Sequence, residues 1–252
     1  MEQEPDSSRE IVWTSERTKR LWDFYSKKLA GNQYFSYHSG HYILKFINRY
    51  LNIWNMESIL DFGCGPGYLL DHLLKFKGLK GKLYALEFSK ESIHQVNMKF
   101  SNHPHFGRAE YIQNLPCSFE DHSMDVVISI EVVEHLTDGQ LRGTFKEFYR
   151  MLKPGGYAVI TTPHNENLDL NKTICPECGL VFHRWQHIKT WTPQSLKNIL
   201  SESGFKIELV QATYFQSARA RWLNRILRIG TLSFKRPDSQ LPHLIAIVKK
   251  NA

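Results

Sequence analysis

Three closely spaced glycines could form a loop that binds a ligand through the protein backbone. Gly63, Gly65 and Gly67 follow a short apolar run, with Asp61 just before them. Glycine permits the tight turn and removes the Cβ atoms that would obstruct a ligand. Glu87 lies twenty residues after Gly67, at a spacing where a carboxylate can accept hydrogen bonds from both hydroxyls of a ribose. Together the two segments indicate a ribose-containing ligand.

The glycine spacing argues against a dinucleotide-dependent oxidoreductase. The pattern G-x-G-x-x-G, counted from Gly63, requires a glycine at position 68, and the chain has Tyr68 there.

A second group of chemically capable residues follows the apolar run 125–130. In a helical turn Glu131, Glu134 and His135 would share one face, because positions i, i+3 and i+4 are neighbours. Two carboxylates and an imidazole this close favour a bound cation, and this ligand set suits Mg²⁺, Mn²⁺ or Fe²⁺. Without a metal, His135 is a candidate general base. The alternative is that His135 only packs near a substrate.

A cysteine pair at Cys175 and Cys178 is followed by His183 and His187. The spacing C-x2-C-x4-H-x3-H could close a tetrahedral zinc site. A plain reduced turn is the alternative, and a redox role is disfavoured because no thioredoxin-like context surrounds the pair.

The elements that must position these residues alternate between short apolar runs and segments of helical length. The patterns predict helices over 16–30 and 39–51, and strands over 58–62, 82–86, 110–113, 125–130, 157–162, 205–212 and 244–249. Such alternation predicts an α/β fold with a parallel sheet covered by helices on both faces. Ligands of such sheets bind at the carboxyl ends of the strands.

The chain has 252 residues, which suits one α/β domain, 1–252, with insertions. We expect N-terminal helices in 1–54, the core in 55–163, a Cys/His insertion in 164–191, and C-terminal strands with a basic helical insertion in 192–252. In that last insertion Arg221, Arg225 and Arg228 would share one helix face. This face could be a lid, a phosphate contact, a membrane-surface helix or an ordinary solvated surface.

Charge and composition bound the partners and the compartment. The net charge of +7 favours an acidic partner such as RNA, although many basic proteins bind no polyanion. No run of about 18 apolar residues occurs, so we expect no integral membrane segment. The polar first ten residues do not read as a signal peptide. Four cysteines without a secretory signal predict a reducing, cytoplasmic location. The oligomeric state is not indicated.

These motifs together resemble the class I S-adenosylmethionine (SAM)-dependent methyltransferases. Residues 61–67 (D-F-G-C-G-P-G) resemble the first motif of that family, Glu87 matches its acidic residue after the second strand, and residues 152–156 (L-K-P-G-G) resemble its turn before the fifth strand. The resemblance implies a Rossmann-like, doubly wound sheet of seven mostly parallel strands with an antiparallel last strand.

The same resemblance implies SAM as the cofactor and a set of residues that bind it. Residues 63–65 would contact the methionine part of SAM, and Glu87 and Phe88 the ribose and the adenine edge. Where family members often carry an acidic residue near the adenine amino group, this chain has Gln113 or Asn114. The complete implied set is Asp61, Gly63, Cys64, Gly65, Gly67, Glu87, Phe88, Gln113 and Ile130.

A further resemblance concerns the acidic and histidine residues. Residues 182–192 resemble a segment of the small-RNA 3′-terminal 2′-O-methyltransferases, and residues 131–135 also resemble the ubiquinone-pathway O-methyltransferases. The first resemblance implies a divalent ion, Mg²⁺ or Mn²⁺, held by Glu131, Glu134, His135 and His187. Without an ion, His135 or His187 would be the catalytic base. Since His187 cannot serve two ions unless it bridges them, zinc would keep Cys175, Cys178, His183 and an unidentified fourth ligand.

The expected function is SAM-dependent O-methylation of a small-molecule or glycan hydroxyl. The first alternative is a metal-dependent RNA 2′-O-methyltransferase. An alternative of another class is a non-catalytic binding subunit with the SAM fold and a zinc knuckle.

Overall fold

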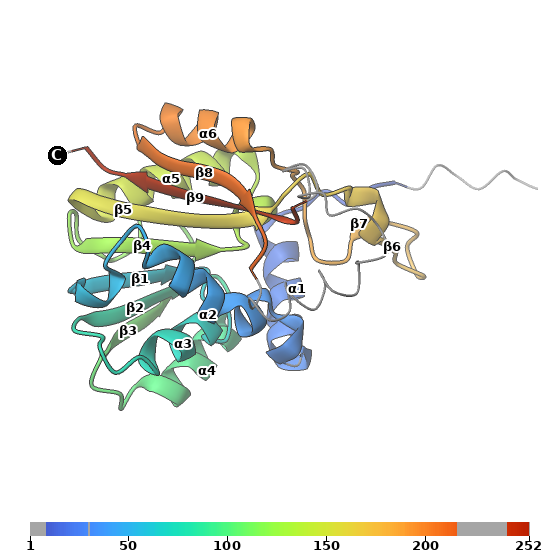
Figure 1. Ribbon diagram of the computed structural model, residues 1–252. Helices are drawn as coiled ribbons and strands as arrows, with labels where there is room; N and C mark the ends of the chain where they lie inside the picture. Colours follow the sequence, from blue (N-terminus) through green and yellow to red (C-terminus); the bar gives the residue numbers. More distant parts are fainter. Residues whose placement is uncertain (1–8, 30, 216–240, 252) are drawn as a thin grey trace, which may run out of the picture.

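The structure is a computed structural model, and it describes residues 9–29, 31–215 and 241–251 (Figure 1). The predicted basic helix with Arg221, Arg225 and Arg228 lies outside these residues. Among the described helices, none combines the length and the apolar character needed to cross a membrane.

A seven-stranded sheet has the order β3-β2-β1-β4-β5-β9-β8. The first five strands pair in parallel, and β9 is antiparallel to both of its neighbours. This arrangement confirms the predicted doubly wound sheet with an antiparallel last strand. The strands are β1 Ser58–Phe62, β2 Lys82–Glu87, β3 Phe106–Tyr111, β4 Met124–Ile130, β5 Leu152–Pro163, β8 Lys206–Thr213 and β9 His243–Lys249.

Helices cover both faces of the sheet, and each face has its own apolar core (Figure 1). Side chains of α2, α3 and α4 pack in one core, and those of α5 and α6 pack in the other. Every residue of β1 is buried, as expected for a central parallel strand covered on both faces. The helices are α1 Ser15–Lys28, α2 Phe35–Ile47, α3 Tyr68–Leu74, α4 Lys90–Phe100, α5 Asp138–Met151 and α6 Pro193–Glu202.

Some element boundaries differ from the predicted ones. The third strand was expected at 110–113 but begins at Phe106. β3 lies at the sheet edge and exposes Gly107 and Arg108, so its apolar pattern is weak. β5 begins at Leu152 and so includes the L-K-P-G-G segment that was expected to be a turn. The second helix spans Phe35–Ile47 rather than 39–51.

The predicted insertion 164–191 contains a hairpin of β6, Lys172–Ile174, and β7, Val181–His183. It lies with α1 beyond one end of the main sheet (Figure 1). Two contacts join them: the Tyr25 hydroxyl donates to the Arg184 carbonyl, and Trp22 Nε1 donates to Gln186 Oε1 at 3.0 Å. The insertion and α1 therefore close over the same end of the strands.

Asp61 is a carboxyl group buried in the central strand. Its residue is 2% exposed, and its Oδ2 atom has no hydrogen-bond partner. Burial, and next the nearby charge of Glu87, raise the pKa of Asp61 to about 8 from the ordinary 3.8. The folded protein therefore keeps a proton on Asp61 at pH values where the unfolded chain has lost it.

This proton predicts a specific dependence of stability on pH. The stabilisation linked to Asp61 is complete below about pH 4 and is lost as the pH rises through about 8. Asp61→Asn removes the titrating group, so its free energy of unfolding should fall less steeply between pH 5 and 9 than that of the wild type. Urea unfolding at a series of pH values measures both slopes, with Asp169→Asn as the exposed control. Equal slopes for Asp61→Asn and the wild type would show that this carboxyl is ionised in the folded protein.

Candidate active site

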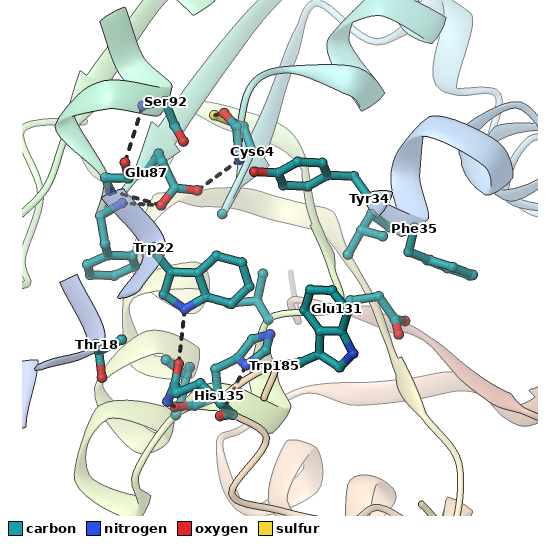
Figure 2. A pocket seen from close by; sticks show the side chains of 18 of the residues that line it. Thr18, Trp22, Tyr34, Phe35, Cys64, Glu87, Ser92, Glu131, His135 and Trp185 are labelled. Atoms are coloured by element: carbon teal, nitrogen blue, oxygen red, sulfur yellow. Dashed lines mark hydrogen bonds between the residues drawn. The ribbon is translucent and has the colours of Figure 1, made fainter. Parts of the chain in front are cut away.

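The carboxyl ends of β1, β2, β4 and β5 border one cavity of about 790 Å³, within the roughly 300–1,000 Å³ typical of ligand sites. Residues of α1, including Trp22 and Ser26, line it from the other side. We call the part beside residues 63–65 the loop end and the part beside His135 and His187 the histidine end. Figure 2 shows Glu87 on one side of the Trp22 indole and His135 on the other.

At the loop end, Glu87 holds the glycine loop against the end of β2. Its Oε2 accepts the Gly65 N–H at 2.8 Å, and its Oε1 accepts those of Phe88 and Ser89 at 2.7 and 3.0 Å. Burial raises the pKa of Glu87, and these three donors partly offset that rise. Gly63 has a φ of +76°, and an added Cβ would lie 2.4 Å from a Val132 methyl group. The turn therefore requires glycine at this position.

Most of the predicted cofactor-binding residues meet at this end. Seven line the cavity: Gly63, Cys64, Gly65, Glu87, Phe88, Gln113 and Ile130. Two lie outside the lining, because Asp61 is buried within β1 and Gly67 precedes the first turn of α3.

At the histidine end, ligand atoms of Glu134, His135 and His187 lie within 4.8 Å of one another. Glu134 is fully buried, and its Oε2 accepts the Thr162 hydroxyl at 2.9 Å. Its Oε1 lies 3.8 Å from His135 Nε2 and has no hydrogen-bond partner. Burial, and next the charge of Glu131, raise the pKa of Glu134. A buried oxygen without a partner, beside two imidazoles, suits a bound cation.

His135 is neutral in this environment. Burial, and next the neighbouring imidazole of His187, lower the pKa of His135 to about 3. Its Nδ1 lies 3.3 Å from the Gln186 carbonyl oxygen, and Trp22 packs edge-on against its ring.

Glu166, three residues after the end of β5, contacts two histidines of the insertion. Its Oε2 lies 2.5 Å from His187 Nδ1, and its Oε1 lies 3.5 Å from His183 Nε2 without hydrogen-bond geometry. Burial favours a higher pKa for Glu166, but the hydrogen bond from His187 and the charges of both imidazoles outweigh it, so the pKa lies below its usual value.

The predicted shared face of Glu131, Glu134 and His135 is wrong for Glu131. This residue has a φ of +53°, and a 3₁₀ turn begins only at Val133. A left-handed residue interrupts the helical spacing on which the prediction relied. The Glu131 carboxylate accepts the Thr161 hydroxyl at 2.9 Å and lies 3.3 Å from His243 Nδ1, outside the group of Glu134, His135 and His187.

The predicted zinc set of Cys175, Cys178 and His183 is not assembled. His183 pairs with Lys172 in the hairpin, whereas the cysteines lie at its tip. Three strand positions separate Lys172 from Cys175, which is about 10 Å at the usual rise. Among the described residues, no group of three potential ligands contains either cysteine. The hairpin register instead places His183 beside Glu166 and His187.

Sequence reasoning did not identify four residues of the site: Trp22, Ser26, Glu166 and Gln186. Glu166 could have been found, because it lies three residues after the fifth strand, at the end where ligands bind. Trp22 and Ser26 belong to a helix in which the sequence shows no functional motif. Gln186 lines the cavity because of the way the insertion folds, which the sequence pattern does not reveal.

Comparison with known proteins agrees with this geometry. A family model described as a methyltransferase domain matches residues 32–210, more than half of the chain. The mitochondrial ubiquinone biosynthesis O-methyltransferase of Mus musculus is 30% identical over 186 residues, which cover 65% of this chain and 45% of that protein. Across the curated relatives, the matched regions span 20% to 58% of their length.

Solved structures share the fold at low sequence identity. A complex of the Haloferax volcanii Trm112 methyltransferase activator with a methyltransferase gives a TM-score of 0.66 at 16% identity, covering 92% of this chain and 98% of that one. A SAM-dependent methyltransferase from Mesorhizobium loti gives 0.57 at 16% identity, covering 82% and 97%. With its family match and this sheet order, the chain belongs to the methyltransferase-domain family and is a class I SAM-dependent methyltransferase.

Proposed function

We propose that this enzyme transfers the methyl group of SAM to a hydroxyl oxygen of a small molecule or a glycan. The observation that carries the proposal is the pairing, in one cavity, of a cofactor-shaped loop end with two adjacent imidazoles, those of His135 and His187. A hydroxyl is a weak nucleophile until a base takes its proton, and an imidazole suits that task. The name of the mouse relative, an O-methyltransferase, supports oxygen as the methylated atom.

In this proposal SAM occupies the loop end. The ribose hydroxyls donate to Glu87, which already accepts three backbone N–H groups. The adenine lies near Phe88 and Gln113, and the methionine part lies near residues 63–65, all of which line the cavity. SAM held there would supply an electrophilic methyl group to an acceptor at the histidine end.

Transfer proceeds by in-line attack of the acceptor oxygen on the sulfonium methyl carbon. The new C–O bond forms as the C–S bond breaks, and S-adenosylhomocysteine leaves. The hydroxyl proton passes to an imidazole Nε2. Because the pKa of His135 is lowered to about 3, His135 is a weak base. We therefore assign the proton to His187, with His135 positioning the acceptor oxygen.

The enclosure of the cavity supports a small acceptor. The contacts of Trp22 with Gln186 and of Tyr25 with Arg184 join α1 to the insertion across the site. A partly covered cavity of about 790 Å³ suits SAM together with a compact acceptor.

A second candidate is metal-dependent methylation of an RNA 2′-hydroxyl. The observation that favours a metal is the buried Glu134 Oε1, which lacks a hydrogen-bond partner beside His135 and His187. These three residues would hold a divalent ion such as Mg²⁺ or Mn²⁺, and an ion there would lower the pKa of an acceptor hydroxyl.

Methyl transfer into separated cell fractions tests the acceptor class. With labelled SAM, we expect label in the small-molecule or glycan fraction, and its persistence after chelation would assign the proton transfer to the histidine. Label in RNA that disappears with chelator would replace this proposal with the second candidate. SAM binding without label in any fraction would indicate a non-catalytic binding subunit.

Glu87→Gln should weaken SAM binding. Replacing the charged acceptor removes hydrogen bonds worth about 1.5–3 kcal/mol each, so we expect the Kd for SAM to rise roughly 10- to 100-fold. Isothermal titration calorimetry measures this change, with the exposed Glu202→Gln as control. An unchanged Kd would remove Glu87 from the cofactor site.

His187→Ala should slow transfer without weakening SAM binding. Loss of the proton acceptor is expected to lower kcat by about 10²- to 10⁴-fold. His94→Ala, an exposed histidine on α4, is the matched control. Retention of wild-type kcat by His187→Ala would exclude His187 as the base.

A further inference from the structure

Hydrogen bonds at one ring nitrogen each of His183 and His187 determine where these two imidazoles carry hydrogen. A neutral imidazole has one N–H and one nitrogen lone pair, and the hydrogen bond at one nitrogen fixes the state of the other. Glu166 contacts both His183 and His187, so its carboxylate influences both rings.

His183 carries its hydrogen on Nε2. The backbone N–H of His187 donates to His183 Nδ1 at 3.1 Å, so Nδ1 is an acceptor without hydrogen. The neutral ring then has its N–H at Nε2, which lies 3.5 Å from Glu166 Oε1. His183 is 4% exposed, and no described side chain other than Glu166 lies within ion-pair distance of this nitrogen.

His187 carries its hydrogen on Nδ1. This nitrogen lies 2.5 Å from Glu166 Oε2, and a carboxylate oxygen accepts hydrogen bonds. In the neutral ring, Nε2 of His187 therefore has a free lone pair. The neighbouring His135 has its Nδ1 at 3.3 Å from the Gln186 carbonyl oxygen.

We propose that Glu166 is a positioning residue that fixes His187 in the Nδ1–H tautomer and so presents the Nε2 lone pair at the histidine end. His183 Nε2 faces the second oxygen of Glu166 at 3.5 Å, too poorly aligned for a hydrogen bond. The use of this lone pair in methyl transfer rests on the proposed function, whereas the tautomer itself does not. Carboxylate–histidine pairs orient imidazoles in this way in many sites.

The same contacts argue against a second metal site. Ligand atoms of Glu166, His183 and His187 lie within 4.8 Å of one another. His183 would have to bind an ion through Nε2, but the hydrogen bond from the His187 backbone to Nδ1 keeps Nε2 protonated. Ligand histidines instead donate their other N–H to an acceptor.

Nitrogen NMR of the histidine side chains in the full-length protein tests the proposal directly. We expect ¹⁵N shifts of the Nδ1–H form for His187 and of the Nε2–H form for His183, assigned with His187→Gln and His183→Gln. The Nε2–H form at His187 in the wild type would overturn the proposal, and this measurement requires no change at Glu166.

Glu166→Gln adds a second test. A glutamine has one accepting oxygen and an NH₂ group that donates, so it cannot present an accepting oxygen to each histidine. We expect His187 to populate the Nε2–H form, and kcat to fall roughly 10- to 100-fold with an unchanged Kd for SAM. Glu166→Asp, which keeps two accepting oxygens, should restore the Nδ1–H form in part. Glu177→Gln, an exposed carboxylate of the same insertion, is the control.

The two proposals fail separately. The expected tautomers without methyl transfer to any hydroxyl would reject the proposed function and leave the role of Glu166 intact. An unchanged His187 tautomer in Glu166→Gln would reject the positioning role, even in a fully active enzyme.

Discussion

The carboxylate of Glu87 connects the two strand ends that shape the loop end of the cavity. It accepts N–H groups from Gly65 in one segment and from Phe88 and Ser89 in the other. Ser89 in turn donates to Asp23 of α1, and the Ser26 hydroxyl lies 2.7 Å from that of Ser92, so the covering helix is anchored to the same place. Because charged hydrogen bonds are strong when buried, one side chain fixes the loop, the strand end and the helix above them.

At the histidine end, the main constraint is the free-energy cost of burying charged groups. Buried charges are costly unless they are paired, and here Glu134, His135 and Glu166 lie close together with little access to water. The protein manages this cost through local chemistry: His135 is neutral, Glu166 is paired with His187, and the pKa of Glu134 is raised. In the proposed function, the Nε2 lone pair of His187 is the base of this end of the cavity.

Family and fold leave the acceptor open, because the same α/β sheet carries many chemistries. The matched relatives are mostly longer proteins, and their substrates belong to them. In this chain the insertion after β5 and α1 lie over the site and are joined through Trp22, Tyr25, Arg184 and Gln186. The acceptor class therefore depends on this cover and on the histidines beneath it.

The sequence alone was enough for the sheet and the glycine loop, because strand periodicity and glycine conformation are local properties, and seven of the residues that it proposed for the cofactor line the cavity. It also pointed to Glu134, His135 and His187, whose residue types suit acid, base or metal chemistry. It misplaced Glu131 and the zinc set, and it missed Glu166. Each of these depended on the tertiary structure: a left-handed φ at Glu131, the register of the hairpin that separates Cys175 from His183, and the approach of residues 166 and 187. Such features arise when distant segments pack together, and spacing along the chain does not encode them.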